Sequence, residues 1–246
     1  MEADVMRQAI WLVVLITSIG FMGATAATAH HVLITYVPRH QQFLPLLIFD
    51  SGEEFFPCAV DFDGDLDPTN NHERYTTSAP PVIYYAVVRR ENYTVYEYWI
   101  YYAYNPAVNI HEHDLERAYV FVRGGKPVIL AASAHHWWNL YRVDRMEDLY
   151  LYVEKGGHAM AHVLIGAPEG HQYSVVSNGL GRRIYPDEVE LRPLSDFISK
   201  EPYLLDPNGY LWTNEAGDLV QGVTVRPDYW EPEMVLTEEF KELLGV

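Results

Sequence analysis

The stretch YVFVRGGKPVIL, residues 119–130, decides the fold of the central part of the chain. Two runs of β-branched and aromatic residues flank the pair Gly124-Gly125. Both central positions of a type I′ turn need a positive φ, so this pair predicts a β-hairpin with a two-residue turn. Arg123 would then pair with Lys126, and that pairing would set the register of both strands.

The segment HEHDLE, residues 111–116, precedes this hairpin and is rich in metal-ligand and acid–base side chains. Alternate side chains of a strand share a face, so we expect Asp114 and Glu116 together, with Glu112 beside them if the strand begins early enough. Two carboxylates this close repel each other, which raises the pKa of one unless a cation lies between them. The segment therefore predicts a metal ion, an arginine or lysine, or a shared proton.

The hairpin register supplies a partner for this segment. Continued from the turn, it places Asp114 opposite His135 and Glu116 opposite Ser133. Directly opposed side chains project on the same side of a sheet, so Asp114, Glu116 and His135 would form one patch. A bulge or a slip by one residue would break this arrangement.

Histidines are the other candidate site residues. His111 and His113 are expected on the opposite face from the two carboxylates, unless the loop before the strand turns them. His135 belongs to the run AHHWW, residues 134–138, which suggests either the rim of a site or a packed corner of satisfied imidazoles. His158 follows a second Gly-Gly pair, and its place at a tight turn favours a role in a site.

Composition bounds the class of protein. The chain has 246 residues and a formal charge of −17, which argues against nucleic acid as a ligand and fits a protein that binds cations. Its 19 tyrosines and many β-branched residues indicate a β-rich fold. Cys58 is the one cysteine, so no intrachain disulfide forms, and its apolar surroundings indicate a buried thiol.

The N-terminal segment predicts export. Arg7 precedes the apolar run at residues 10–16, and Ala24-Thr25-Ala26 or Ala27-Thr28-Ala29 offers a small-residue cleavage site. Residues 1–29 are therefore expected to be a signal peptide, and residues 30–246 a single domain, secreted to the extracellular space or cell envelope. The alternative is an uncleaved membrane anchor.

Further elements follow from the periodicity of apolar residues. Strands are expected at residues 32–37, 46–49, 81–90, 94–104, 149–154, 172–177 and 219–225. Short helices are expected at residues 193–200 and from Thr237.

An acidic loop offers a second candidate cation site. Asp61, Asp63, Asp65 and Asp67 stand at alternate positions, and calcium takes six to eight oxygen ligands of this kind. The spacing is not that of an EF-hand, because the glycine falls at the fourth position of the loop. The alternative is a solvated acidic turn.

The segment at residues 110–116 resembles the hallmark Gly-His-Arg-His-Asp-Trp-Glu of the necrosis-inducing (necrosis- and ethylene-inducing-peptide-like) protein family. Both histidines, the aspartate and the glutamate match, whereas Ile110, Glu112 and Leu115 differ. Gly157-His158-Ala159 is similar to a later element of that family. Residues 46–62 look more like the vacuolar protein sorting protein sixty-two family.

The resemblance implies an antiparallel β-sandwich that holds a divalent cation in an acidic pocket. The matching pocket residues are His111, Asp114, Glu116 and His158, and Asn105 lies nearest to an upstream aspartate of the family. Cytolytic members bind plant sphingolipid headgroups. The toxin role is not carried over, because Glu112 replaces the arginine of the motif.

Three functional hypotheses follow. The first is a secreted protein that binds a glycan or lipid headgroup through calcium or magnesium, which oxygen ligands favour over zinc. The second is a metal-dependent hydrolase with His111, His135 or His158 as general base. The third is a structural cell-envelope protein with a carboxylate network. A membrane would be met only through an uncleaved N-terminus or by surface binding.

Overall fold

The computed structural model describes residues 38–66, 70–107, 110–134, 137–162, 179–200, 210–213, 219–221 and 232–246. The chain divides into two units, Met1–Tyr36 and Val37–Val246, and the described residues all belong to the second. The expected signal peptide and the strands expected at residues 32–37 and 172–177 lie outside them, so the domain organisation stays a prediction. Within the described ranges, no helix is long and apolar enough to span a membrane.

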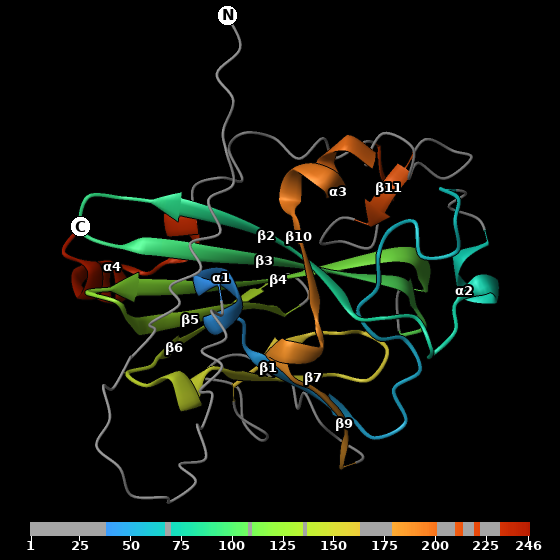
Figure 1. Cartoon of the computed structure of the whole chain (residues 1–246), viewed down its shortest axis with the longest axis horizontal. Coiled ribbons are helices and arrows are strands. Elements are labelled where there is room, and N and C mark those ends of the chain that lie inside the picture. The colour runs from blue at the N-terminus through green and yellow to red at the C-terminus, as the bar shows by residue number, and fades with distance from the viewer. Residues whose placement is uncertain are drawn as a thin grey trace, which may run out of the picture. The chain divides into compact units, whose positions relative to one another are not determined.

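The larger sheet has six strands in the order β10-β2-β3-β4-β5-β6 (Figure 1). They are β2 (Val82–Arg89), β3 (Thr94–Asn105), β4 (His111–Arg123), β5 (Lys126–Ala134), β6 (Trp137–Arg142) and β10 (Glu190–Pro193). Neighbouring strands are antiparallel, except that β10 and β2 are parallel. The aromatic runs at residues 81–90 and 94–104 become β2 and β3.

The second sheet has four strands in the order β8-β7-β1-β9. They are β1 (Leu46–Asp50), β7 (Tyr150–Val153), β8 (Met160–Ala161) and β9 (Leu180–Ile184), and β1 pairs with β7 in parallel. The strands β11 (Tyr210–Thr213) and β12 (Leu219–Gln221) form a separate pair. The α-helices are short: α1 (Arg39–Gln42), α2 (Asn71–Arg74), α3 (Leu194–Lys200) and α4 (Glu238–Leu244). Single 3₁₀ turns cover Met146–Asp148, Pro186–Glu188 and Pro232–Val235.

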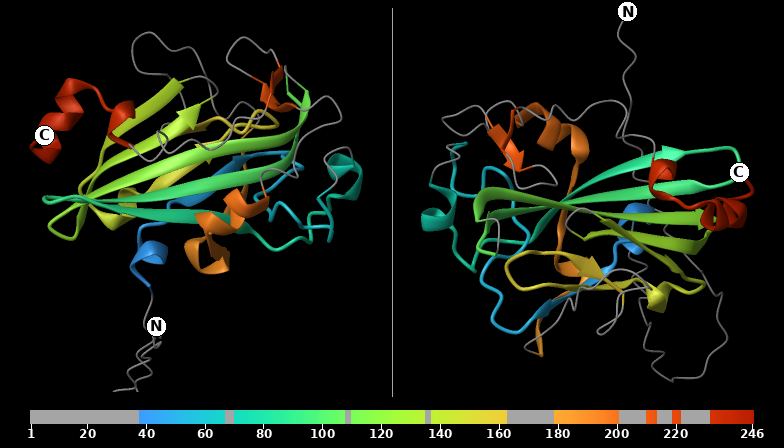
Figure 2. Two further views of the ribbon diagram at one scale, coloured as in Figure 1. Left: turned by 90° about the horizontal axis from the view of Figure 1, so that it is seen from above. Right: turned by 180° about the vertical axis from the view of Figure 1, so that it is seen from behind.

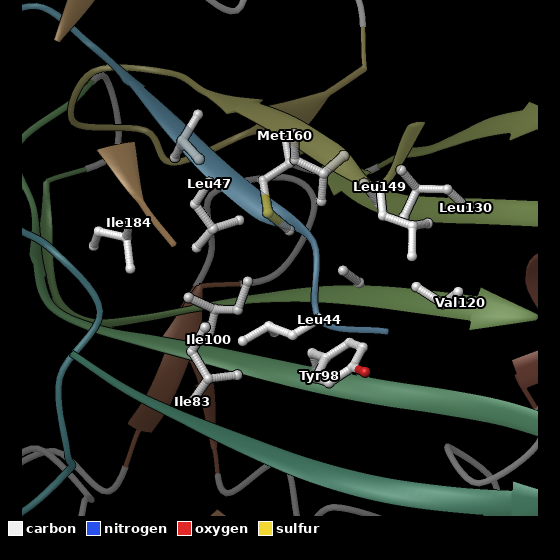
Figure 3. Packing of buried hydrophobic residues seen from close by; sticks show 14 of the residues in the cluster. Leu44, Leu47, Ile83, Tyr98, Ile100, Val120, Leu130, Leu149, Met160 and Ile184 are labelled. Carbon is white, nitrogen blue, oxygen red and sulfur yellow. The ribbon is translucent and has the colours of Figure 1, made fainter. Parts of the chain in front are cut away.

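The two large sheets pack face to face over a buried apolar core (Figure 3). The larger sheet contributes Ile83, Ile100, Val120 and Leu130, and the smaller one contributes Leu47, Leu151, Met160 and Ile184. The prediction of a β-rich sandwich with short helices is therefore confirmed. It is mainly antiparallel, with one parallel pair in each large sheet.

Short helices cover parts of the outer face of the larger sheet. Leu194 and Phe197 of α3 join one outer cluster, and Leu244 of α4 joins another. The helices α2 and α4 lie at opposite ends of the long strands (Figures 1 and 2). Arg123, beside the hairpin turn, donates a hydrogen bond of 2.9 Å to the Leu243 carbonyl, which places α4 at the turn end. The α2 end is therefore the open end of the β4–β5 hairpin.

The hairpin turn forms as expected. Gly124 and Gly125 have φ values of 57° and 80°, and Arg123 pairs with Lys126. A side chain at either glycine would meet open space, so the requirement there is conformational, because L-residues rarely adopt these angles.

The expected register is wrong beyond this turn. Val122 pairs with Pro127, but Phe121 pairs with Ile129, so Val128 is the extra residue of a β-bulge. A bulge cannot be read from apolar periodicity in this short strand, because both of its flanking runs remain apolar. The sequence predicted that Asp114 lies opposite His135 and Glu116 opposite Ser133 at the open end of the hairpin. Both pairings assumed an unshifted register, and the bulge shifts it by one residue.

Candidate functional site

Asp114 and Glu116 lie on the inner face of the larger sheet. Asp114 pairs across β3–β4 with Tyr102, and Glu116 pairs with Ile100. Tyr102 and Ile100 both belong to the core between the sheets, and opposed residues share a face. Both carboxylates are buried, with 7% of Asp114 and 5% of Glu116 exposed. Two acidic residues therefore lie at the edge of an apolar core, where each needs a partner.

A buried histidine lies between two of the acids. The Nδ1 atom of His158 is 2.6 Å from Oδ2 of Asp114, and its Nε2 atom is 3.6 Å from Oε1 of Glu53. Burial by itself would lower the pKa of His158, but the hydrogen bond to Asp114 and the nearby charges of Asp114 and Glu53 outweigh burial and raise it to about 9. The imidazole therefore favours its charged form and offsets part of the negative charge.

Glu53 is held by the backbone around it. Its Oε1 atom accepts hydrogen bonds from the N–H groups of Glu54 and Phe55, at 2.8 and 2.7 Å. Its Oε2 atom accepts one of 2.6 Å from the N–H of Gly156. Burial alone would raise the pKa of Glu53, but His158 and these N–H groups together hold it below its usual value. Glu53 thus ties the turn after β1 to the turn that carries His158.

Gly156 brings that turn against the loop that follows β3. Its φ is 74°, and a Cβ built on it would lie 3.1 Å from Cγ of Pro106. Just before this loop, at the end of β3, the side chain of Asn105 donates a hydrogen bond of 3.3 Å to Oδ2 of Asp114. The same Asp114 oxygen therefore has contacts from the turn that carries His158 and from the end of β3.

Glu116 has a different set of partners. The hydroxyl of Ser133 donates a short hydrogen bond to Oε2 of Glu116, and it accepts one of 2.6 Å from the N–H of Arg117. Burial raises the pKa of Glu116 well above its usual value, and the charge of Asp114 raises it further. The expected repulsion between neighbouring carboxylates is thus present at this pair.

Tyr102 packs against His158 on the inner face. Its ring stacks on the imidazole of His158, with centroids 3.8 Å apart and planes 3° from parallel. Its hydroxyl is buried and has no hydrogen-bond partner among the described residues. Burial raises the pKa of Tyr102 well above its usual value, and the charges of Glu116, Asp114 and Glu53 raise it further. A phenol donor without an acceptor beside these carboxylates is unusual.

Glu112 and His113 of the HEHDLE segment contact other parts of the chain. His113 lies 2.7 Å from the Tyr101 hydroxyl through Nδ1, on the opposite face of the sheet. Glu112 contacts His72 of α2 through its carboxylate. The backbone of His111 is part of β4, but its side chain is outside the description, and His135 lies outside the described residues altogether.

The acidic loop forms ion pairs with basic side chains of the same chain. Asp61 lies 3.0 Å from Nζ of Lys200 and 3.3 Å from Nη1 of Arg192. Burial alone would raise the pKa of Asp61, but these cations hold it below its usual value. Oδ1 of Asp63 accepts a hydrogen bond of 3.3 Å from the N–H of Asp65. Asp67 lies outside the described residues, so calcium at this loop stays a prediction.

The outer face of the same strands also carries a buried acid, Glu97. The carboxylate of Glu97 accepts a hydrogen bond of 3.5 Å from the Trp99 indole at Oε2, and Oε1 has no hydrogen-bond partner in the described part of the chain. Burial raises the pKa of Glu97 to about 7, although Trp99 and the Arg117 charge lower it in part. The Arg117 guanidinium lies 5.3 Å from the ring centre of Trp99 and 5.2 Å from that of Trp138.

The sequence did not single out two residues that meet this site. Glu53 lies in the turn after β1, and its one local signal is the preceding Gly52, whose φ is 83°. Tyr102 stood within an aromatic strand, where nothing distinguished it from its neighbours. Only the stacking of Tyr102 on His158 and the burial of Glu53 mark them out.

Comparison with known proteins gives a fold-level likeness. No protein-family model and no curated protein matches the chain. One similar solved structure is Necrosis and Ethylene inducing Protein 2 from the causal agent of cocoa's witches' broom disease, at 22% identity and a TM-score of 0.36. That match covers 48% of this chain, and this chain spans 62% of the length of that protein.

Two further structures are similar. NLPPya in complex with mannosamine matches at 17% identity over 62% of this chain and 70% of that one, with a TM-score of 0.40. A structure described as a toxin fold as basis for microbial attack and plant defense matches at 14% identity over 80% and 88%, with a TM-score of 0.47. These values are too low to carry an argument about function. None of the three is described as a vacuolar sorting protein, so that resemblance stays a prediction.

Proposed function

We propose that the chain binds a divalent cation at Asp114 and Glu116, and through it the hydroxyl groups of a glycan or a lipid headgroup. The observation that carries the proposal is the pair of buried carboxylates on one face. On the neighbouring strand, the hydroxyl of Tyr102 has no hydrogen-bond partner within the described part of the chain. Carboxylate oxygens suit calcium or magnesium, and a cation-bound water would give the phenol an acceptor.

The surrounding residues have the arrangement of an outer shell. Ligating carboxylates in metal sites are usually held by further hydrogen bonds, which fix their orientation. Here His158 and Asn105 contact Oδ2 of Asp114, and Ser133 contacts Oε2 of Glu116. Both ring nitrogens of His158 face carboxylates, so the proposal gives this residue an orienting role instead of a direct bond to the cation.

The proposed site has two protein ligands and relies on water for the others. Among the described residues, no group of three or more His, Cys, Asp or Glu is arranged to hold a metal ion. Magnesium is usually bound by one or two carboxylates and keeps several waters, so it does not need such a group. Magnesium is therefore the first ion to test at Asp114 and Glu116, with calcium second.

A structural role is the alternative that one observation favours. The contacts from Glu53 to His158 to Asp114 lie within the chain and offset charge without any added ion. In that case the network would serve the fold alone. The hydrolase hypothesis gains no support from His158, which is fully buried between its two carboxylate partners.

Thermal unfolding in EDTA, Mg²⁺, Ca²⁺ and Zn²⁺ tests the cation proposal. A ligand that binds only the folded state raises the midpoint, by about 5 to 11 °C at a hundredfold excess over the dissociation constant for a domain of this size. We expect that rise with Mg²⁺ or Ca²⁺, and we expect Glu116→Gln to abolish it. Glu54→Gln is the matched control, because Glu54 is acidic and exposed. Equal midpoints in EDTA and in both ions would leave the structural role in place.

Calorimetric titration tests the ligand class. Glucosamine and mannosamine are the first probes, followed by vesicles that carry glycosylated sphingolipid headgroups. We expect binding heat in the presence of the cation and none in EDTA. Binding that persists in EDTA would separate glycan recognition from Asp114 and Glu116.

We also propose that the chain is exported, on the strength of the apolar run and small-residue site within residues 1–29. Mass spectrometry of the protein recovered from culture medium should find a mature N-terminus after Ala26 or Ala29. Recovery of the intact N-terminus in the membrane fraction would point to an anchor instead.

A further inference from the structure

The backbone of β4 is left-handed at one residue, immediately before the candidate cation ligand Asp114. His113 has a φ of 61°, and His158 has a φ of 54°; these are the non-glycine residues with positive φ in the described part of the chain. Few L-residues adopt this region, and histidine does so more readily than most. A single left-handed residue inside a strand needs neighbours that hold it in place.

Two buried side chains hold His113. Its Nδ1 atom lies 2.7 Å from the Tyr101 hydroxyl and 3.1 Å from Nδ2 of Asn71, and Asn71 also donates to that hydroxyl at 2.8 Å. An amide nitrogen can only donate, so Nδ1 of His113 accepts and the ring proton resides on Nε2. All three side chains are buried. The ring of His113 is therefore fixed in place from α2 and from β3.

The residues on either side of His113 contact different elements. Glu112 contacts His72 of α2, and His113 contacts Asn71 of the same helix. Asp114, the next residue, contacts His158 on the inner face. The register of β3 with β4 is unchanged across His113, because Tyr102 pairs with Asp114 and Tyr104 pairs with Glu112. The backbone immediately before Asp114 is therefore anchored to α2.

We propose that His113 is a positioning residue: its left-handed backbone, held by Asn71 and Tyr101, sets the orientation of Asp114 toward His158 in the inner-face site. The part of this inference that concerns cation affinity rests on the proposed function. The part that concerns the orientation of Asp114 toward His158 does not, because it concerns a contact within the chain.

Two substitutions of His113, by glycine and by alanine, distinguish the effect of its backbone conformation from the effect of its ring. His113→Gly and His113→Ala both remove the imidazole, but only glycine adopts a positive φ without a steric cost. We expect the alanine variant to bind Mg²⁺ about tenfold more weakly than the glycine variant, given the usual cost of a left-handed alanine. Equal affinities of the two variants would overturn the inference.

A second readout does not depend on any cation. In EDTA, the ring ¹⁵N and ¹H resonances of His158 report its hydrogen bond to Asp114. We expect the glycine variant to keep the wild-type signals and the alanine variant to lose them. If wild type binds no cation while these signals still separate the variants, the proposed function fails and the positioning role stands. If the signals are the same in both variants, the positioning role fails.

Tyr101→Phe covers the case in which His113→Ala does not fold. It removes the hydroxyl that contacts Nδ1 of His113 and keeps the ring. We expect it to shift the His158 signals in the wild-type background and to have no effect in the His113→Gly background, because the ring it supports is then absent. An effect of equal size in both backgrounds would show that the Tyr101 hydroxyl acts elsewhere, and would overturn the inference.

Discussion

The two faces of the larger sheet each bury a carboxylate on the same pair of strands, and they accommodate it differently. On the inner face Glu116 has Ser133 as a hydrogen-bond donor and Asp114 as a neighbour. On the outer face, among the described residues, the carboxylate of Glu97 accepts a hydrogen bond only from the Trp99 indole, at 3.5 Å. Burial alone therefore does not mark a site. The inner acids have an ordered shell of partners, whereas the pKa of Glu97, near 7, lets a proton neutralise it.

Removing the charge of Asp114 should have the largest effect. Asp114→Asn leaves the buried imidazole of His158 without its closest carboxylate, which lies 2.6 Å away. Breaking a buried pair from one side costs about 3 kcal/mol or more, so the free energy of unfolding in EDTA should fall by that amount. The rise of the midpoint with Mg²⁺ should also disappear. Urea unfolding followed by circular dichroism measures the first effect.

Asp144→Asn is the control for this change. Its side chain is 88% exposed and lies 3.4 Å from Arg145, so its removal should cost less than about 0.5 kcal/mol. A similarly small effect for Asp114→Asn would show that the inner-face network contributes little to the fold.

Glu97→Gln should have the next largest effect, and its sign depends on pH. The pKa of Glu97 is raised from 4.5 in the unfolded chain to about 7 in the fold. Between these values the folded state binds the extra proton, so wild-type stability falls as pH rises, by on the order of 3 kcal/mol in total. Relative to wild type, the free energy of unfolding of the glutamine variant should therefore rise as pH increases to above 7, and this relative stabilisation should be absent below pH 4.5.

Urea unfolding at several pH values measures this gain. Trp99 and Arg117 belong to both proteins, so their contributions cancel to first order. A difference between the proteins that is the same at pH 4 and at pH 8 would show that Glu97 does not titrate between those values.

Tyr102→Phe should have the smallest effect on stability. The hydroxyl has no hydrogen-bond partner among the described residues, so its loss should change the free energy of unfolding in EDTA by less than about 0.5 kcal/mol. The midpoint rise with Mg²⁺ should nevertheless shrink. Tyr98→Phe is the matched control, because that hydroxyl donates a 2.6 Å hydrogen bond to the His40 carbonyl. Its loss should cost about 1 kcal/mol and leave the Mg²⁺ response intact.

Local patterns predicted much of the fold. The Gly124-Gly125 turn, the aromatic strands β2 and β3, and the helix after Thr237 follow from turn chemistry, β propensity and helix start signals. The bulge at Val128 could not be predicted in the same way. It depends on how β5 fits its neighbours across the sheet, which is a tertiary effect.

The site was less accessible to prediction from sequence. Alternation along a strand accounts for Asp114 and Glu116 on one face, but it does not predict that Glu112 contacts His72 of α2. Glu53 reaches His158 from a distant turn, a contact that no local pattern contains. Strand periodicity therefore predicts the acids of β4, whereas the residues that surround them come together only in the folded chain.

Gly156 sets the distance between two segments of the candidate site without contributing any side chain to it. A methyl group there would lie 3.1 Å from Cγ of Pro106, and the φ of 74° would strain any L-residue at this position. The turn that includes Gly156 carries His158, and Pro106 follows Asn105 at the end of β3. His158 and Asn105 contact the same oxygen of Asp114. The spacing between these two contacts therefore depends on a residue that a search for polar groups would pass over.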